Sequence, residues 1–292
     1  MIVAINGPTA SGKTEVALAL ARELAASGVP AEIVNADSML VYRGMDIGTA
    51  KPTPEQRLLV PHHLIDIMEV TETASVAEFQ RLARAAIADC QARGVLPLLV
   101  GGSALYVRAI LDKMDFPGTD PAIRARYEQR LAEIGPEALH AELAVRAPGV
   151  AAGILPGNAR RTVRALEALD LGGFTSVLPE PEYFYPDVLS FCLQLPRGEM
   201  DSRISARVDW MWEQGFVAEV RGLLERGLRD GLTASRALGY RQIISHLDGA
   251  YSEAEARENT ITGTRRFARK QLAWFRRDPR MVFLDANSAP AS

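Results

Sequence analysis

The chain has 292 residues, of which 48% are hydrophobic and 24% charged, and its formal net charge is -3 at pH 7. This composition is typical of a globular protein, and the slightly acidic balance argues against a generic nucleic-acid-binding protein. No apolar run approaches the roughly 20 residues that span a bilayer, and Met1 leads directly into a strand rather than a signal peptide, so we expect a cytoplasmic protein with no membrane partner. The two cysteines, Cys90 and Cys192, are far apart, and we expect two free thiols rather than a disulfide.

The N-terminal segment predicts a strand, a glycine loop and a helix. Residues 2–6 (IVAIN) are apolar, and a helical pattern follows from Lys13 to Gly28. Between them GPTASGKT matches G-x-x-x-x-G-K-[ST], in which backbone N–H groups bind phosphate oxygens, lysine adds charge and the last hydroxyl can ligate Mg²⁺. A loop that merely turns the chain is the alternative, but the strand before it and the helix after it favour a phosphate site. The predicted phosphate-binding residues are Gly7, Pro8, Thr9, Ala10, Ser11, Gly12, Lys13 and Thr14, with Thr14 as the expected Mg²⁺ ligand.

Strands and helices continue to alternate through the first third of the chain. Residues 31–37 (AEIVNAD) predict a second strand, and residues 94–103 (GVLPLLVGGS) predict a buried strand with a second glycine loop. A helix is expected from about Ser75 to Arg93, with Ser75 and Glu78 spaced as a capping box. This alternation predicts an α/β fold, a parallel sheet like that of P-loop NTPases flanked by helices.

The pattern changes after residue 116. Residues 117–187 show only helical periodicity, a strand-like segment returns at 188–195, and long amphipathic helices extend from about Met200 to Arg276. Residues 281–285 (MVFLD) are a candidate for a last strand. We therefore expect a catalytic core of residues 1–116 and 188–292, and an all-helical insertion domain of residues 117–187.

The phosphate loop lacks the partner that a nucleotide hydrolase would have. Such an enzyme needs an apolar strand ending in an acid that holds Mg²⁺, but the strand of residues 94–103 ends in Gly101, Gly102 and Ser103. The strongest strand-end acid is Asp37, and Asp66 is a weaker candidate. Asp37 can be read as a turn or cap residue. Its place off the carboxyl end of a strand, where open α/β sheets bind ligands, also suits a base that accepts a proton from a nucleophile.

Eight segments along the chain are informative as a set: GPTASGKT, NADSMLVYRGMDIGTAKP, PHHLID, LLVGGSALYVRAI, RRTVRALE, GFVAEV, ALGYRQ and TRRFARKQLAWFRR. They occur in the order seen in bacterial tRNA dimethylallyltransferases, also called tRNA isopentenyltransferases. The chain resembles this family over nearly its whole length. The resemblance implies transfer of a dimethylallyl group from dimethylallyl diphosphate to the exocyclic amine of the adenine 3′ of the anticodon, in tRNAs that read codons beginning with U. It also implies that the phosphate loop holds the substrate's diphosphate, with Mg²⁺ as cofactor.

The resemblance assigns roles to individual residues. Asp37 is the expected base, and Arg203 is expected to add a guanidinium to the diphosphate, although a solvated helix arginine is the alternative. Ser103 stands where the family usually has threonine near the reacting centre, and Arg160 where it usually has glutamine. The implied tRNA-binding residues are Asp37, Ser38, Met39, Leu40, Ser103, Arg124, Arg160, Arg161, Thr162, Val163, Arg164, Arg265 and Arg269.

A local basic segment supports an RNA partner. Residues 264–280 carry the basic side chains Arg265, Arg266, Arg269, Lys270, Arg276, Arg277 and Arg280 against the single acid Asp278. They are candidates for phosphate contacts, the alternative being a solvated charged face. We expect the neighbouring aromatic residues Phe267, Trp274 and Phe275 to be core anchors rather than base-stacking platforms.

The histidines and cysteines have no metal-ligand spacing. We expect His62 and His63 to be structural, and the chain to lack the Cys/His zinc module of the family's eukaryotic members.

Two other functions share part of this pattern. A small-molecule kinase would have the same phosphate loop, but it would also need lid arginines and a nucleotide-base pocket. An RNA-binding GTPase-like switch would need an N/T-K-x-D segment, which the chain does not contain. The sequence therefore favours a prenyltransferase, and nothing in it demands more than a monomer.

Overall fold

The chain folds into two compact units in the computed structural model, which describes residues 1–116, 118–173 and 179–288. The core unit comprises Met1–Lys113 and Tyr183–Ser292, and the helical unit comprises Met114–Glu182. The helical unit thus starts slightly before residue 117, itself outside the described residues, and ends before the predicted residue 187. The difference at its end has a local cause: Tyr183 forms an antiparallel bridge with Asp112, and Phe184 N–H donates to the Leu111 carbonyl at 2.7 Å. These bonds hold the returning segment on the core unit.

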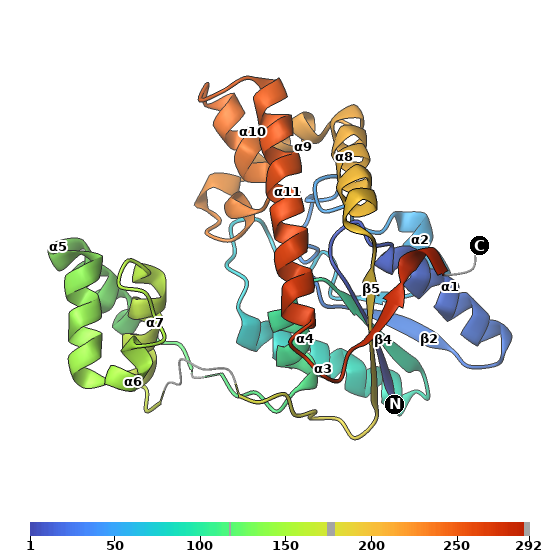
Figure 1. Cartoon of the computed structure of the whole chain (residues 1–292), viewed down its shortest axis with the longest axis horizontal. Helices are drawn as coiled ribbons and strands as arrows, with labels where there is room; N and C mark the ends of the chain where they lie inside the picture. Colours follow the sequence, from blue (N-terminus) through green and yellow to red (C-terminus); the bar gives the residue numbers. More distant parts are fainter. Residues whose placement is uncertain (117, 174–178, 289–292) are drawn as a thin grey trace. The chain divides into compact units, whose positions relative to one another are not determined.

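The core unit is built on a parallel sheet of six strands in the order β3-β2-β4-β1-β5-β6. Figure 1 labels β2, β4 and β5 of this sheet. All neighbouring strands are parallel, which confirms the predicted α/β fold. The sequence did not predict β3, because a strand of two residues has no alternation to detect. The strands are β1 (Ile2–Asn6), β2 (Ala31–Asn35), β3 (His62–His63), β4 (Leu96–Gly101), β5 (Val188–Gln194) and β6 (Val282–Asp285).

Helices cover both faces of this sheet because successive strand residues point to opposite sides. Val3 and Ile5 of β1 pack with the residues of α1, whereas Ile2 and Ala4 belong to a larger cluster that includes α3 and α4. The helices of the core unit are α1 (Lys13–Ala26), α2 (Pro54–Leu59), α3 (Val76–Ala92), α4 (Ala104–Leu111), α8 (Arg197–Glu213), α9 (Phe216–Glu225), α10 (Tyr240–Leu247) and α11 (Glu253–Phe275). Three short 3₁₀ helices complete it: η1 (Leu228–Asp230), η2 (Ala234–Arg236) and η3 (Ala286–Ser288).

Three smaller predictions about the start of α3, the cysteines and membrane-spanning helices can be compared with the structure. At the start of α3 the Ser75 side chain accepts from Glu78 N–H at 3.5 Å, which is half of the predicted capping box. Cys90 and Cys192 are both free and buried, which confirms the prediction of two free thiols. Within the described ranges, no helix is both long and apolar enough to cross a membrane.

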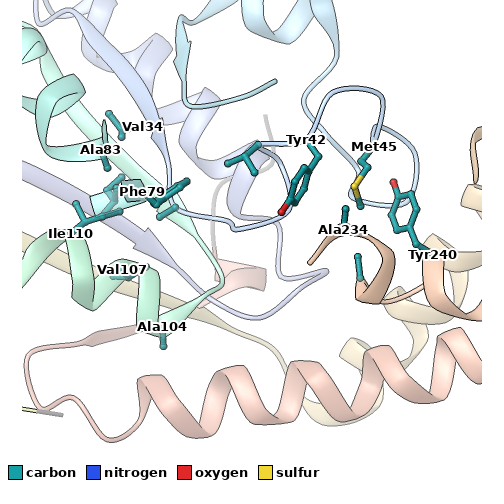
Figure 2. Close-up of a cluster of buried hydrophobic side chains, with 14 of the residues drawn as sticks. Val34, Tyr42, Met45, Phe79, Ala83, Ala104, Val107, Ile110, Ala234 and Tyr240 are labelled. Carbon is teal, nitrogen blue, oxygen red and sulfur yellow. The ribbon is translucent and has the colours of Figure 1, made fainter. Parts of the chain in front are cut away.

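The largest hydrophobic cluster extends from the sheet into the loop that follows β2. Figure 2 shows Tyr42 and Met45 of this loop beside Ala234 and Tyr240. Tyr240 in turn packs edge-on against Phe216, with ring centroids 4.9 Å apart. The loop of residues 38–52 is therefore part of the core, although it contains no helix or strand.

The helical unit has a hydrophobic core of its own. It consists of α5 (Pro121–Arg146), α6 (Pro148–Ala151) and α7 (Ala159–Asp170). α5 is kinked at Gly135, whose φ of 81° is left-handed, just before Pro136. The hydrophobic core of the helical unit includes the buried residues Tyr127, Leu139, Leu143, Val163 and Leu166. Among the residues described for this unit there is no strand, in line with the predicted all-helical insertion.

We predict that Gly48→Ala destabilises the core unit. A methyl group at Gly48 would overlap the buried ring of Phe216 and lie 2.6 Å from that of Tyr240. Neither ring has free space to move into, so we expect a loss of about 1–3 kcal/mol in the free energy of unfolding, measured by urea denaturation.

The matched control is Gly222→Ala in the neighbouring helix α9. A methyl group there meets nothing within 4 Å, and alanine favours a helix over glycine by about 0.5–1 kcal/mol. Equal stability changes in the two variants would contradict the tight packing of the 38–52 loop.

Candidate active site

The phosphate loop joins β1 to α1 and has the backbone that an anion site needs. Gly7 and Gly12 have φ values of 149° and 85°, and a methyl group on Gly7 would lie 2.8 Å from both the Leu193 carbonyl and the Ser11 hydroxyl. Only glycine fits at Gly7. The loop therefore brings its amides and the N-terminus of α1 to one place, where a phosphate is favoured. The Lys13 ammonium donates to the Pro8 carbonyl at 2.7 Å, so it lies against its own loop.

Strand register brings Asp37 and Ser103 to the same edge of the sheet as the phosphate loop. Asn6 of β1 pairs with Gly101 of β4, and Ala36 N–H donates to the Val100 carbonyl at 2.8 Å. A methyl group on Gly101 would overlap the Ala36 backbone, so the two strand ends are in close contact. Ser103, half-buried, is the N-cap of α4. The predicted catalytic residues Asp37 and Ser103 thus lie off adjacent strand ends.

The backbone around Asp37 is fixed by the side chain of Asn35. Asn35 Oδ1 accepts from Asp37 N–H at 2.7 Å, and its Nδ2 donates to the carbonyls of Asp37 and Leu64 at 2.9 and 3.0 Å. Asp37 Oδ1 accepts from Met39 N–H at 2.9 Å. The carboxylate is therefore held in a short turn, and Asp37, Ser38, Met39 and Leu40 are all half-buried. The turn interpretation of Asp37 holds, and it is compatible with a catalytic role.

Lys13, Asp37 and Arg207 form the charged centre of the site. Burial lowers the pKa of the Lys13 ammonium to about 8, the Asp37 carboxylate opposes this shift, and the Arg207 guanidinium adds to it. Burial also lowers the pKa of Arg207, against the opposing charges of Glu15 and Asp37. Two cations and one carboxylate thus interact across the mouth of the phosphate loop, an arrangement that favours an anionic ligand.

Arg207 is the residue of this centre that the sequence missed. The predicted Arg203 is exposed and pairs with Glu199 at 2.8 Å and with Asn287 at 3.1 Å. Arg207 lies one turn further along α8, and its Nη2 donates to the Thr49 carbonyl at 3.2 Å. Its Nε is buried and has no hydrogen-bond partner in the part of the chain that the structure describes. The spacing of four residues from Arg203 was the available signal, because it places both arginines on one side of the helix.

Gln271 joins the phosphate loop to the glycine loop after β4. This buried side chain of α11 accepts from Thr9 N–H at 3.0 Å and donates to the Gly102 carbonyl at 2.9 Å. A methyl group on Gly102 would lie 2.5 Å from the amide nitrogen of Gln271. One amide thus connects two loops whose bonded residues, Thr9 and Gly102, are 93 residues apart in sequence. Sequence spacing gave no sign of this contact.

The 38–52 loop is held by a carboxylate from α9. Glu219 accepts from the amides of Asp46, Ile47 and Gly48 at 3.0, 2.7 and 3.3 Å, and from the Tyr240 hydroxyl at 2.6 Å. At the other end of the loop, the buried Lys51 ammonium is bound by three oxygens. These are the Tyr42 carbonyl at 2.7 Å, Asp46 Oδ1 at 2.6 Å and Asp66 Oδ1 at 2.5 Å. Asp66, the weaker acid candidate, is thus a structural partner of Lys51.

The predicted RNA-binding residues of the helical unit fall into two groups. Arg160 and Arg161 are exposed on α7. Thr162 and Val163 are buried in the core of the unit, so the structure does not place these two predicted side chains at the surface. Arg124 and Arg164 bind the fully buried carboxylate of Glu167 at 2.8 and 3.0 Å and are partly exposed.

The exposed face of α11 carries both charge and aromatic rings. Arg265 is half-buried and donates to the Asp201 carbonyl at 3.2 Å, whereas Arg269 is exposed. Of the aromatic residues expected to be core anchors, only Phe275 is buried. Phe267 and Trp274 are 45% and 40% exposed, so that prediction was wrong for both. Seven residues apart, they lie on the same side of the helix, at the edge of the face that buries Ala268 and Gln271.

Comparisons with known proteins agree with the resemblance read from the motifs. The family model described as IPP transferase matches residues 40–278. The chain is 59% identical to the tRNA dimethylallyltransferase of Thermobifida fusca over 285 residues, 97% of this chain and 89% of that protein. It is 60% identical to the protein of the same name from Kineococcus radiotolerans over 288 residues, 98% of this chain and 90% of that one.

Solved structures give the same result. The tRNA isopentenylpyrophosphate transferase of Bacillus halodurans superposes with a TM-score of 0.71 at 40% identity, over 98% of this chain and 89% of that one. A eukaryotic dimethylallyltransferase acting on tRNA superposes with a TM-score of 0.83 at 24% identity, over 98% of this chain and 73% of that one, which is a likeness of fold. Because the family model matches most of the chain and these relatives match nearly all of it, the chain belongs to the IPP transferase family.

Proposed function

We propose that this protein transfers the dimethylallyl group of dimethylallyl diphosphate to the exocyclic amine of the adenine 3′ of the anticodon, in tRNAs that read codons beginning with U. Membership of the IPP transferase family and the names of relatives at 59% and 60% identity favour this reaction over phosphoryl transfer from ATP. The observation that carries the proposal is the charged centre of Lys13, Asp37 and Arg207 at the phosphate loop. It offers a base and two cations where a diphosphate would leave.

The chemistry needs a proton acceptor. The adenine amine is a weak nucleophile because its lone pair is delocalised into the ring. As the new C–N bond forms, the C–O bond to the diphosphate breaks, and the leaving group takes that electron pair. Asp37 accepts the proton that the amine loses. Met39 N–H binds Oδ1 of Asp37 and leaves Oδ2 for this role.

The leaving diphosphate gains negative charge in the transition state. The amides of the phosphate loop, Lys13 and Arg207 would then bind it more strongly than they bind the substrate, which is the source of catalysis. We retain Arg203 as a second guanidinium for the same anion, since it lies one turn before Arg207 on α8. Ser103 would contribute its hydroxyl at the neighbouring strand end.

A Mg²⁺ cofactor fits the donor atoms of the site. Mg²⁺ takes oxygen ligands, often one or two from the protein with the rest from phosphate and water. The Thr14 hydroxyl at the start of α1 is such an oxygen. The ion would neutralise charge on the diphosphate when bound.

The tRNA would be bound by basic and aromatic surfaces. On α11 the exposed Arg266, Arg269 and Lys270 suit phosphate contacts, and the exposed rings of Phe267 and Trp274 can stack on unpaired bases. In the helical unit we assign RNA contacts to Arg160 and Arg161, with Arg124 and Arg164 behind them. A tRNA substrate places the protein in the cytoplasm, and one chain supplies all these residues, so we propose that it acts as a monomer.

Asp37→Asn tests the base directly. Asparagine keeps an oxygen for Met39 N–H, so the turn survives, but the amide cannot accept a proton. We expect the rate of prenylation of an anticodon stem-loop to fall at least about 100-fold, with RNA binding unchanged. The assay uses dimethylallyl diphosphate and Mg²⁺, with product adenine measured by mass. Near-parental turnover would remove Asp37 as the base, and phosphoryl transfer from ATP without prenylated RNA by the parent would overturn the proposed function.

The pKa of Lys13 predicts a pH dependence of diphosphate binding. Since the free enzyme loses the Lys13 proton near pH 8, and a bound diphosphate stabilises the ammonium, affinity should fall as pH rises above about 8. We expect Lys13→Arg, whose guanidinium stays charged, to lose this dependence even if it binds more weakly at pH 7. Calorimetric titration with inorganic diphosphate from pH 7 to 9 measures it. The same decline in both proteins would show that another group is responsible.

Gln271 should act as a positioning residue for the two loops. Gln271→Met keeps the length of the side chain but loses the bonds to Thr9 and Gly102, and we expect kcat to fall at least about tenfold because small misplacements slow chemistry. Gln80→Met is the matched control, since Gln80 donates to the Ala109 carbonyl at 2.6 Å away from the loops. We expect both variants to lose thermal stability but only Gln271→Met to lose kcat. Parental kcat in folded Gln271→Met would contradict the role.

A further inference from the structure

Three potential metal ligands meet near the β3 edge of the sheet, outside the site described above. Glu32 lies on β2, His63 on β3 and Cys90 in the last turn of α3. Their ligand atoms all lie within 4.8 Å of one another. Glu32 alternates with Ile33, which faces α1, so Glu32 points to the side that α3 covers. The residues are 31 and 27 positions apart, which is why sequence spacing did not reveal the cluster.

The distances among these atoms approach those of a tetrahedral zinc site. Cys90 Sγ lies 3.5 Å from Glu32 Oε2 and 3.6 Å from His63 Nε2. With Zn–S of about 2.3 Å and Zn–N and Zn–O of about 2.0–2.2 Å, tetrahedral ligand atoms are about 3.3–3.6 Å apart. The third pair, Glu32 Oε2 and His63 Nε2, is 2.7 Å apart, the length of a hydrogen bond. To admit an ion, this pair would need to open by roughly 0.6–0.7 Å, and Arg93 would have to release Glu32 Oε2.

The charges around the cluster allow a divalent ion. Arg93 binds both oxygens of Glu32 at 2.7 Å and also pairs with Asp89 at 2.8 Å. If Glu32 Oε2 turned to an ion, Arg93 would keep Glu32 Oε1 and Asp89. A thiolate and a carboxylate would neutralise Zn²⁺, and Asp89 would neutralise Arg93. The guanidinium would then orient the metal-bound carboxylate through its hydrogen bond to Oε1.

The cluster is largely, but not fully, shielded from solvent. Cys90 is fully buried, and the side chains of Glu32 and His63 are only 13% and 27% exposed. Glu32 is already ionised, since hydrogen bonds from Arg93 lower its pKa to about 2. Burial raises the pKa of the Cys90 thiol to about 11, so an ion must displace its proton. Such competition is usual for thiolate ligands.

We propose that Glu32, His63 and Cys90 bind one Zn²⁺ ion, with a water molecule as fourth ligand. On binding, the Cys90 thiol releases its proton to solvent, and neutral His63 coordinates through Nε2 with its hydrogen on Nδ1. The ion ties the two-residue strand β3 to β2 and α3. Because the carbonyl of Leu64, next to His63, accepts from Asn35, the ion also supports the segment that holds Asp37. None of these three residues belongs to the Mg²⁺ position proposed at Thr14.

Titration of the full chain with Co²⁺, a spectroscopic substitute for Zn²⁺, tests the proposal. After treatment with a chelator, we expect one Co²⁺ per chain with a thiolate-to-metal charge-transfer band, displaced by Zn²⁺. The matched pair is Cys90→Ser and Cys192→Ser, since Cys192 is the other buried cysteine. Cys192→Ser should keep the band, and Cys90→Ser should lose it, with affinity reduced at least about 100-fold.

A second variant, His63→Gln, tests the proposal even if Cys90→Ser does not fold. His63→Gln leaves the thiol in place, and it should weaken Zn²⁺ binding and abolish the rise in melting temperature that Zn²⁺ gives the parent. Below the pKa of Cys90, affinity should rise about tenfold per pH unit, because one proton is released. Absence of the band in the parent, or its persistence in Cys90→Ser, would overturn the proposal and leave the three residues as a hydrogen-bonded network only.

Discussion

Three successive backbone amides of the 38–52 loop donate hydrogen bonds to the Glu219 carboxylate. The geometry of the site depends on this interaction. The 38–52 loop has no helix or strand, so its backbone polar groups need other partners. Glu219 supplies them for Asp46, Ile47 and Gly48, and the Tyr240 hydroxyl also donates to this half-buried carboxylate. The next carbonyl, that of Thr49, then binds Arg207. A carboxylate on α9 thereby determines where a guanidinium of α8 lies relative to Lys13 and Asp37.

This chain of contacts gives a physical reason for several of the motifs. The segments GMDIGTAKP, LIDI, GFVAEV and ALGYRQ supply Asp46 and Lys51, Asp66, Glu219 and Tyr240 respectively. Distant in sequence, they meet around one loop, and their direct partners are each other rather than the phosphate loop. Their part in the proposed reaction is therefore to hold Arg207 and the turn of Asp37 in place. Gly48 belongs to the same arrangement, because only glycine leaves room for the rings of Phe216 and Tyr240.

What the sequence predicted well is what short-range physics determines. The phosphate loop, the strand before Asp37 (predicted to residue 37, ending at Asn35 in the structure) and the start of α3 after Ser75 all follow from residues within a few positions of each other. Parallel strands then bring those loops to one edge of the sheet. What could not be predicted depends on long-range contacts. Gln271 reaches Thr9 from 262 residues away, and the exposure of Phe267 and Trp274 depends on which side of α11 meets the core.

Helix α11 connects the two halves of the proposed reaction. Its buried face carries Gln271, which holds the phosphate loop and the loop before Ser103, and its exposed face carries Arg269, Lys270 and Trp274. A continuous helix is stiff over this length, so RNA bound to the exposed face would act on the same rigid element that sets the loop geometry. RNA binding would thus affect the loops at the diphosphate site without any contact between RNA and diphosphate. Residues on the exposed face should therefore govern RNA affinity. The buried amide of Gln271 should instead govern whether the bound RNA and diphosphate are correctly positioned for the reaction.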